Sequence, residues 1–331
     1  MAAARGIPEA PAPRSQHSAT PDLAANRIWI FGGAATDGTY LNDLHAWDAS
    51  QMCWSGPVAT TGLPPAPRGG HVAALHANTL WVFAGTAAAL SPSLARPRLL
   101  NDVHALDLAT LQWRSVSPRG AAPPPPPPPP PRAFAAAALL PSLGALVVTG
   151  GAAAASPRAL RDAWLLDLRP QSCGAWRQLA PLPADLSTGA PSPRAYHTLA
   201  ASADDSHVMA LGGVTADAEA AAAAAVAAAP YVESLAIGDG GDTTWLQRDA
   251  TAAAPACASA ALEVLAPASS LQRYAAAAAQ AGDLLYEFGG YVAAGGAGGV
   301  LGDASLRVRR LVRQGPEAPL CAHLVEVIAA A

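Results

Sequence analysis

The chain has 331 residues, of which 51% are hydrophobic and 13% charged, and this composition excludes a wholly disordered protein. Its formal net charge is −4 and no basic block is present that would follow a phosphate backbone, so we expect no nucleic acid among its partners. The cysteines have no CxxC spacing, which favours neither a disulfide framework nor a zinc site and indicates a reducing compartment.

Membrane and targeting segments are not evident. The alanine run 218–229 is too short and too weakly apolar to span a bilayer. Residues 1–12 lack the apolar stretch of a secretory signal, and we expect them to form a flexible N-terminal segment. We therefore expect a cytoplasmic protein, with the nucleus as the alternative, and no membrane among its partners.

Short apolar runs rich in β-branched and aromatic residues end in a glycine pair or its remnant, which predicts a strand followed by a turn. They lie at 28–33, 80–85, 146–151, 208–213 and 285–290. Their glycines are Gly32, Gly33, Gly85, Gly150, Gly151, Gly212, Gly213, Gly289 and Gly290. An arginine precedes each run, at Arg14, Arg68, Arg132, Arg194 and Arg273. A histidine follows three of these arginines by three residues, at His17, His71 and His197.

An acidic residue follows each glycine pair and opens another apolar run. These acidic residues are Asp43, Asp102, Asp162, Glu233 and Asp303. A tryptophan comes next in all repeats except the last, at Trp54, Trp113, Trp176 and Trp245. Each repeat therefore predicts four strands, which carry the arginine, the glycines, the acidic residue and the tryptophan in that order.

This order resembles the kelch repeat, and the resemblance covers roughly residues 13–313. It implies an all-β propeller, residues 13–331, in which each repeat is one four-stranded blade around a central channel. Five repeats are recognisable, at about 13–55, 67–114, 131–177, 193–246 and 272–328. The tail 318–328 either completes the fifth blade or begins an incomplete sixth, so the number of blades stays open.

The signature residues are interpreted as architectural, and the tryptophans are expected to fill the space between blades rather than to stack on a ligand. Some repeats depart from the pattern. Ala84 replaces the first glycine of the second repeat, and Phe134 and Ala135 stand where other repeats lead to a histidine. Glu287 lies inside the glycine strand of the fifth repeat, which is the least well specified.

The spacing of the signature residues predicts which loops vary. From arginine to second glycine the interval is 17 to 19 residues, whereas from second glycine to acidic residue it ranges from 10 to 20, and from tryptophan to the next arginine from 14 to 28. In an antiparallel meander these two variable connections emerge at the same end of the sheet. Because binding residues concentrate on variable loops, we interpret this face as the recognition surface. The same loop classes contact the ligand in kelch relatives that act as ubiquitin-ligase adaptors; tolerated drift in length is the alternative.

Several residues on this face are candidate partner contacts. The loop expected at 86–100 carries Arg96 and Arg98, which could pair with a carboxylate or phosphate or be incidental. The segment 115–132 holds Arg119 and the proline run Pro123–Pro131, which predicts a polyproline helix. It contains a PxxPxR arrangement, with Pro127 and Pro130 as contacts for an SH3, WW or profilin-type binder; a spacer is the alternative. Tyr291 completes the set, and the inserts 216–230 and 248–272 lengthen the fourth repeat.

Catalytic motifs such as HExxH, GxSxG and the phosphate-binding glycine loops are absent from the sequence. His17, His71 and His197 could in principle hold a metal, but their place in the repeat favours structural histidines. We therefore assign no catalytic, metal or cofactor residue and expect a non-catalytic scaffold that binds protein partners. The alternatives are a channel-mouth enzyme of the galactose-oxidase-like fold, a substrate-recognition subunit of a ubiquitin ligase, and an actin- or profilin-linked cytoskeletal factor.

Overall fold

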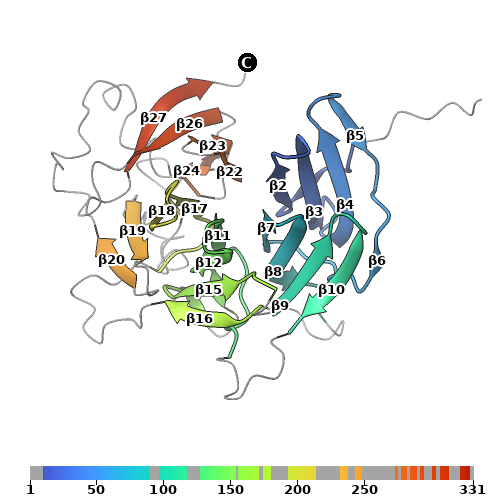
Figure 1. Ribbon diagram of the computed structural model, residues 1–331, viewed down its shortest axis with the longest axis horizontal. Coiled ribbons are helices and arrows are strands. Elements are labelled where there is room, and N and C mark those ends of the chain that lie inside the picture. Colours follow the sequence, from blue (N-terminus) through green and yellow to red (C-terminus); the bar gives the residue numbers. More distant parts are fainter. Residues whose placement is uncertain are drawn as a thin grey trace, which may run out of the picture. The chain divides into compact units, whose positions relative to one another are not determined.

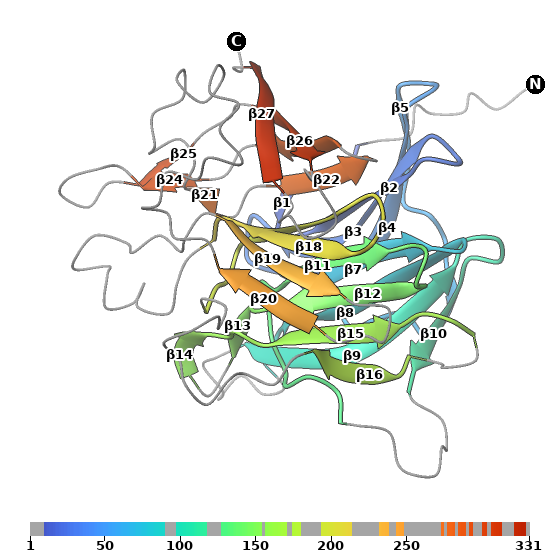
Figure 2. The same cartoon turned by 60° about the vertical axis from the view of Figure 1, so that its left-hand side comes forward.

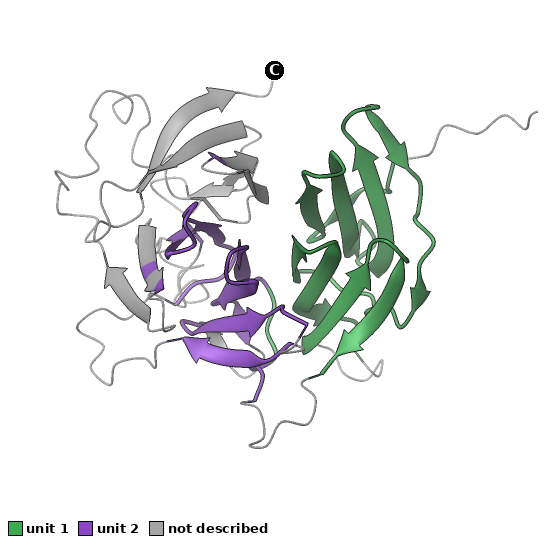
Figure 3. Ribbon diagram, in the orientation of Figure 1, with its two compact units in different colours: residues 1–117, 131–133 green, residues 118–130, 134–331 purple. Residues whose placement is uncertain are grey.

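The computed structural model describes residues 10–89, 97–117, 127–153, 156–170, 174–179, 193–213, 232–237, 243–247, 273–274, 277–281, 284–288, 291–293, 300–302, 306–312 and 321–328. Regular structure in these ranges consists of β-strands, so the all-β prediction is confirmed. The chain divides into unit 1, residues 1–117 with 131–133, and unit 2, residues 118–130 with 134–331 (Figure 3). The expected flexible segment 1–12 lies almost entirely outside the described residues.

The first repeat forms one antiparallel sheet in unit 1 (Figure 1). Its strands are β1 (Arg14–Ser15), β2 (Ser18–Asp22), β3 (Arg27–Ala35), β4 (Tyr40–Asp48) and β5 (Cys53–Ser55). Strands β2, β3, β4 and β5 pair in that order, as the repeat predicts. The short β1 pairs with the C-terminal end of β3, where Arg14 lies opposite Ala35. Arg14 therefore stands just before β2 in the chain.

The second repeat forms the other sheet of unit 1, with β7 (Val72–His76), β8 (Thr79–Ala87), β9 (Arg98–Asp107) and β10 (Gln112–Val116) as its meander. An additional strand, β6 (Thr61–Gly62), pairs in parallel with the edge strand β10. The repeat pattern does not predict β6, because it lies in the connection between two repeats. It covers part of an edge whose backbone groups would otherwise be open to another strand.

The two sheets of unit 1 share one hydrophobic core. Trp29, Phe31, Leu44 and Ala46 of the first sheet pack with Leu80, Val82, Leu106 and Trp113 of the second. Trp113 is 2% exposed, and its ring lies 5.2 Å from that of Phe31. A buried tryptophan removes about 200 Å² from water, which stabilises by up to about 5 kcal/mol at ~25 cal/mol per Å². Trp54, in contrast, is half-buried and packs edge-on against Trp47 of its own sheet.

Unit 2 contains the third and fourth repeats (Figure 2). The third consists of β11 (Ala136–Leu140), β12 (Ala145–Thr149), β15 (Ala163–Asp167) and β16 (Trp176–Leu179), paired in that order. A small hairpin, β13 (Ala152–Ala153) and β14 (Ser156–Ala159), lies between β12 and β15 in the chain. The fourth consists of β17 (Thr198–Ala201), β18 (His207–Leu211), β19 (Val232–Ile237) and β20 (Thr243–Gln247), also paired in that order.

The core of unit 2 is built from smaller side chains than that of unit 1. Alanine, valine and leucine of β11, β12 and β15 pack with those of β17, β18 and β19, among them Val147 at 0% and Leu235 at 0% exposed. Trp176 is 2% exposed on β16. Glu233 and Trp245 lie on β19 and β20, with Trp245 opposite Leu235.

The fifth repeat supplies a further meander, β22 (Ala277–Ala281), β23 (Leu284–Phe288), β26 (Leu306–Val312) and β27 (Cys321–Ile328). A small separate sheet is formed by β21 (Arg273–Tyr274), β24 (Tyr291–Ala293) and β25 (Val300–Gly302). Strand β27 pairs with β26, so residues 321–328 form the last strand of the fifth sheet. Glu287 lies opposite Arg307 in the register of β23 and β26.

The glycine pair coincides with a break in the pairing of the second and third strands. The register shifts between Phe31 and Gly33 in β3 and between Phe83 and Gly85 in β8. The first residue of each pair adopts a left-handed φ, 61° at Gly32 and 63° at Ala84. The second repeat therefore holds an alanine in a conformation that glycine adopts at much lower cost.

Candidate functional site

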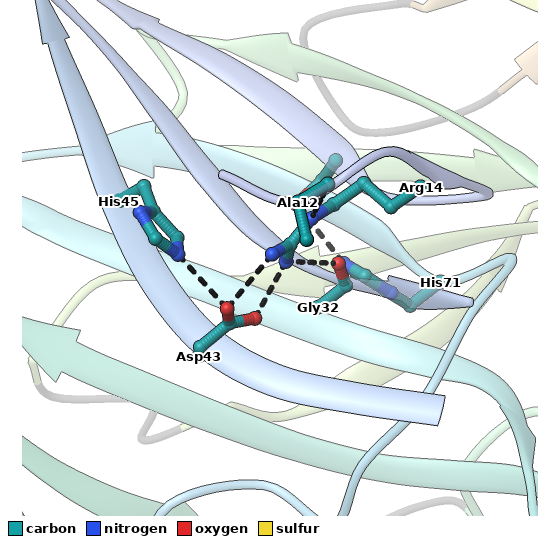
Figure 4. A network of polar contacts seen from close by, with 7 residues as sticks. Ala12, Arg14, Gly32, Asp43, His45 and His71 are labelled. Atoms are coloured by element: carbon teal, nitrogen blue, oxygen red, sulfur yellow. Dashed lines mark hydrogen bonds and ion pairs between the residues drawn. The ribbon is translucent and has the colours of Figure 1, made fainter. Parts of the chain in front are cut away.

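The signature arginine and acidic residue of the first repeat form a bidentate ion pair. Arg14 Nη1 and Nη2 lie 2.5 and 2.8 Å from the two carboxylate oxygens of Asp43, and Nη1 also donates to the carbonyl of Gly32 at 3.1 Å (Figure 4). The arginine side chain is 5% exposed. Three signature residues that are far apart in sequence are therefore joined at one point, where the first strand begins.

The second repeat reproduces this arrangement. Arg68, which is fully buried, donates to both oxygens of Asp102 at 2.7 and 2.8 Å and to the carbonyl of Ala84 at 3.0 Å. Burial raises the pKa of Asp102, but the hydrogen bonds and charges of Arg68 and His104 outweigh it and hold that pKa well below its ordinary value. The carboxylate therefore stays ionised at physiological pH and neutralises a guanidinium that has no access to water.

In unit 2 the signature arginine of the fourth repeat donates to the carbonyl of the first glycine of its glycine pair, as Arg14 does in the first repeat. Arg194 is 3% exposed and donates to the carbonyl of Gly212 at 3.0 Å, the position occupied by Gly32 in the first repeat. Arg132, the signature arginine of the third repeat, belongs to unit 1 and is also fully buried. Arg273 is the first residue of β21, and Gly289, Gly290 and Asp303 of the fifth repeat lie outside the described residues.

A further donor, which the sequence analysis did not single out, contacts the acidic residue in the first three repeats. His45 Nε2 lies 2.8 Å from Asp43, and His104 Nε2 lies 3.0 Å from Asp102. In the third repeat an indole takes this place, because Trp164 Nε1 donates to Asp162 at 2.6 Å. The signal was present in the sequence, since each donor stands two residues after its aspartate on the same face of a strand.

Backbone hydrogen bonds of the signature residues connect one repeat to the next. The N–H of the second glycine donates to the carbonyl of the next repeat's arginine, from Gly33 to Arg68 at 2.8 Å and from Gly151 to Arg194 at 2.9 Å. The N–H of Arg68 in turn donates to the carbonyl of Leu41 at 2.9 Å. A side chain at Gly33 would meet the carbonyl of Ser15 at 2.6 Å, which explains why glycine is needed there.

The signature histidines donate or accept hydrogen bonds between neighbouring sheets. His71 Nε2 lies 2.9 Å from the hydroxyl of Ser18, and His197 Nε2 lies 2.8 Å from that of Thr149. Burial, with Arg68 and His17 adding to it, lowers the pKa of His71 to about 3. Burial and Arg194 likewise lower the pKa of His197 well below its ordinary value. The lowered pKa values keep both imidazoles neutral at physiological pH. Among the described residues, no group of three metal-binding side chains occurs.

The residues predicted to contact a partner lie at different places in the structure. Arg98 is exposed, but it is the first residue of β9 and lies opposite Ala87, so the loop expected at 86–100 is shorter than predicted. Pro127 and Pro130 are exposed, whereas Arg132 is buried, so the PxxPxR arrangement presents prolines without its arginine. Tyr291 begins β24 opposite Tyr274. Arg96 and Arg119 lie outside the described residues.

The repeated four-stranded sheets, and the ion pairs between signature arginines and aspartates, are characteristic of a Kelch-repeat β-propeller protein. The chain belongs to the KLHDC2/KLHL20/DRC7 Kelch-repeats domain family, whose model matches residues 4–213. The resemblance to the kelch repeat is therefore confirmed. The number of blades in the ring does not follow from this match.

Each of the curated relatives matches part of this chain. It is 36% identical over 112 residues to "Acyl-CoA-binding domain-containing protein 5" of Arabidopsis thaliana, which covers 34% of this chain and 16% of that protein. It is 34% identical over 105 residues to "Host cell factor 2" of Homo sapiens, covering 29% and 13%. It is 36% identical over 80 residues to "Kelch domain-containing protein 2" of Bos taurus, covering 24% and 18%. The chain thus spans less than a fifth of the length of these relatives.

Among solved structures, the fold is similar to the one titled "Structure of YjhT", with a TM-score of 0.60 and 15% identity over 94% of this chain and 84% of that one. At this identity the similarity establishes the propeller fold alone. The family and the host cell factor relatives support a protein-interaction module. The described part of the chain contains no helix long and apolar enough to cross a membrane.

Proposed function

We propose that this chain is a non-catalytic module that binds a partner protein through one end of its sheets, the end that bears the connections between second and third strands and between successive repeats. Family membership supports the coarser part of this proposal. The choice of face rests on one observation: the variable intervals of the repeat all fall in connections at this end. Variable loops on a rigid scaffold are where binding residues concentrate.

The signature contacts support the proposal because they make the same end rigid. The Arg14–Asp43 and Arg68–Asp102 pairs stand where the first strands begin, directly beneath these connections. The guanidiniums are buried and saturated by carboxylates and backbone carbonyls, so they hold the loops rather than contact a partner. Exposed residues beside them, such as Arg98 and Pro127, are candidates for the contacts themselves.

The opposite end of the sheets has short connections. Residues 77–78 join β7 to β8, and 108–111 join β9 to β10. Such tight turns offer little adaptable surface, which favours the other end for recognition. We further propose a cytoplasmic location, which the unpaired thiol of Cys53 supports.

The test is affinity capture from native cells with two matched variants. In the first, residues 88–97 and 118–126 are replaced by short Gly-Ser linkers, which leaves β8, β9 and β10 intact. In the second, Leu23→Ser and Met52→Ser remove two side chains, each 72% exposed, from turns at the opposite end. We expect the first variant to lose its specific partners and the second to keep them. If the first variant keeps its partners, or if both variants lose them, the assignment of the recognition surface to this end of the sheets is wrong.

A further inference from the structure

The outer edge of the second sheet is covered by a segment of the connection that precedes it. Strand β6 of this segment pairs in parallel with the edge strand β10 (Figure 1). The N–H of Thr61 donates to the carbonyl of Leu111 at 2.9 Å, and the N–H of Leu63 donates to the carbonyl of Trp113 at 3.2 Å. Two outward carbonyls of this edge are therefore satisfied by the chain itself.

The covering segment has a glycine in its middle and a proline at its end. Gly62 has a φ of 83°, which lies in the left-handed region that favours glycine. A Cβ at this position would stand 2.2 Å from the carbonyl oxygen of Trp113. Pro64 follows the second donor, and because proline has no N–H it ends the pairing. The order glycine, aliphatic residue, proline therefore suits a segment that closes this edge.

The first sheet presents an equivalent edge at β5, which pairs with β4 alone among the described strands. Trp54 takes the same place in the register of β5 as Trp113 takes in β10. Met52 shares the left-handed φ of Leu111, 52° against 54°. The carbonyls of Met52 and Trp54 therefore lie on the outer edge of this sheet. Met52 is 72% exposed and Trp54 is half-buried, whereas Trp113 is 2% exposed.

The chain carries a similar segment ahead of the first sheet. Residues 62–68 read Gly-Leu-Pro-Pro-Ala-Pro-Arg, and residues 6–14 read Gly-Ile-Pro-Glu-Ala-Pro-Ala-Pro-Arg. In both, the final arginine donates from Nε to the carbonyl of the nearby alanine, at 3.1 Å for Arg14 and 3.0 Å for Arg68. The two segments thus make the same contact where they enter their sheets, although residues 1–9 lie outside the described residues.

The N-terminal segment is long enough to reach the edge of the first sheet. Gly62 stands six residues before Arg68, whereas Gly6 stands eight residues before Arg14. The two additional residues can span up to ~7 Å more. A segment tethered this closely meets the edge at a high effective concentration, which favours it over a strand from another chain.

We propose that residues 5–7 cover the outer edge of the first sheet as a parallel strand on β5, as β6 does on β10. The N–H groups of Arg5 and Ile7 donate to the carbonyls of Met52 and Trp54, and the glycine between them lies against the Trp54 carbonyl. The segment closes an edge that would otherwise be open to a strand of another protein. For these residues, a bound strand replaces the flexible segment expected from the sequence.

Disulfide trapping tests the proposed register. Thr61 lies opposite Gln112 in the second sheet, so Arg5 should lie opposite Cys53, whose thiol is unpaired. Neighbouring strands are about 4.8 Å apart, within the range of roughly 4.4–6.8 Å between the Cα atoms of a disulfide. With a mild oxidant, we expect Arg5→Cys to form an intramolecular disulfide with Cys53, in a yield at least about tenfold above that of the matched variant Ala2→Cys. Peptide mapping without reduction measures both yields. Equal yields would contradict the pairing, and a disulfide that joins two chains would assign the edge to a second copy instead.

Trypsin measures the same contact in the unmodified chain, because it cleaves after arginine and a paired strand resists cleavage. We expect the bond between Arg5 and Gly6 to be cut at least about tenfold more slowly in the full chain than in a synthetic peptide of residues 1–13. Gly6→Ala should lose this protection, since its methyl group would meet the Trp54 carbonyl, and Ala2→Val should keep it. Each variant is compared with its own peptide. Cleavage of the unmodified chain at the peptide's rate would leave the edge open to a partner's strand and overturn the proposal, as would protection that survives Gly6→Ala.

Discussion

The two units use the same signature contacts but differ in the side chains placed around them. In both, a buried arginine donates to the first residue of the glycine pair, at Gly32 and Ala84 in unit 1 and at Gly212 in unit 2. Two residues after the arginine, unit 1 carries Gln16 and Gly70, whereas unit 2 carries two stacked aromatic rings. The comparison separates positions whose hydrogen bonds recur in both units from a position whose backbone conformation recurs while its side chain changes.

Acid should destabilise the buried histidine contacts that both units share. This is the largest loss in the free energy of unfolding that we expect. The folded pKa of His71 is about 3 and that of His197 is also lowered, against 6.5 in the unfolded chain. Protons therefore bind the unfolded state preferentially, so the stabilisation is complete above pH 6.5 and is lost as the pH falls below it. His71 should therefore lose ~1.4 kcal/mol per pH unit, or about 2 kcal/mol between pH 6.5 and 5, and the lowered pKa of His197 acts in the same direction.

Urea unfolding at a series of pH values measures this loss. The depressed pKa of Asp102 acts in the same direction but at lower pH, below the ordinary range of a carboxyl group. A His71→Gln variant keeps a side-chain donor for Ser18 and should show a shallower dependence between pH 6.5 and 5. A slope equal to that of the unmodified chain would mean that His71 is protonated in the folded state.

Removing one carboxylate tests the ion pair of unit 1. Asp102→Ala leaves the fully buried Arg68 with only backbone acceptors, and we expect a loss of about 3 kcal/mol in the free energy of unfolding. The estimate is at the lower end for a broken buried pair because Asp102 itself is 39% exposed. Arg27→Ala is the control, since Arg27 is 46% exposed and 3.8 Å from Asp48, and it should cost less than about 0.5 kcal/mol. Equal losses in the two variants would contradict the assigned role of the buried pair.

The sequence predicted the positions of the strands well because glycine, arginine and aspartate have fixed places in each repeat. It also suggested structural histidines, and His71 and His197 are hydrogen-bonded as a structural role requires. The parallel strand β6 was missed because it depends on a neighbouring edge rather than on its own two residues. The stacked ring pair of Phe134 and Tyr196 was missed because a positive φ at Phe134 follows from hydrogen bonding between repeats, which leaves no local pattern.

The smallest changes in stability are expected from substitutions at the first residue of the glycine pair, where the two units carry different residues. In unit 2 a side chain at Gly150 would meet the carbonyl of Arg194 at 2.3 Å, and the φ is 60°. Gly150→Ala should therefore cost about 2 kcal/mol from strain and displacement of the backbone. In unit 1, Ala84 already holds a φ of 63° in a buried position, so Ala84→Gly should stabilise by up to about 1 kcal/mol. Thermal unfolding of both variants, with opposite shifts expected, measures how much strain the second repeat tolerates; a loss of stability in Ala84→Gly would mean that packing of its methyl group outweighs that strain.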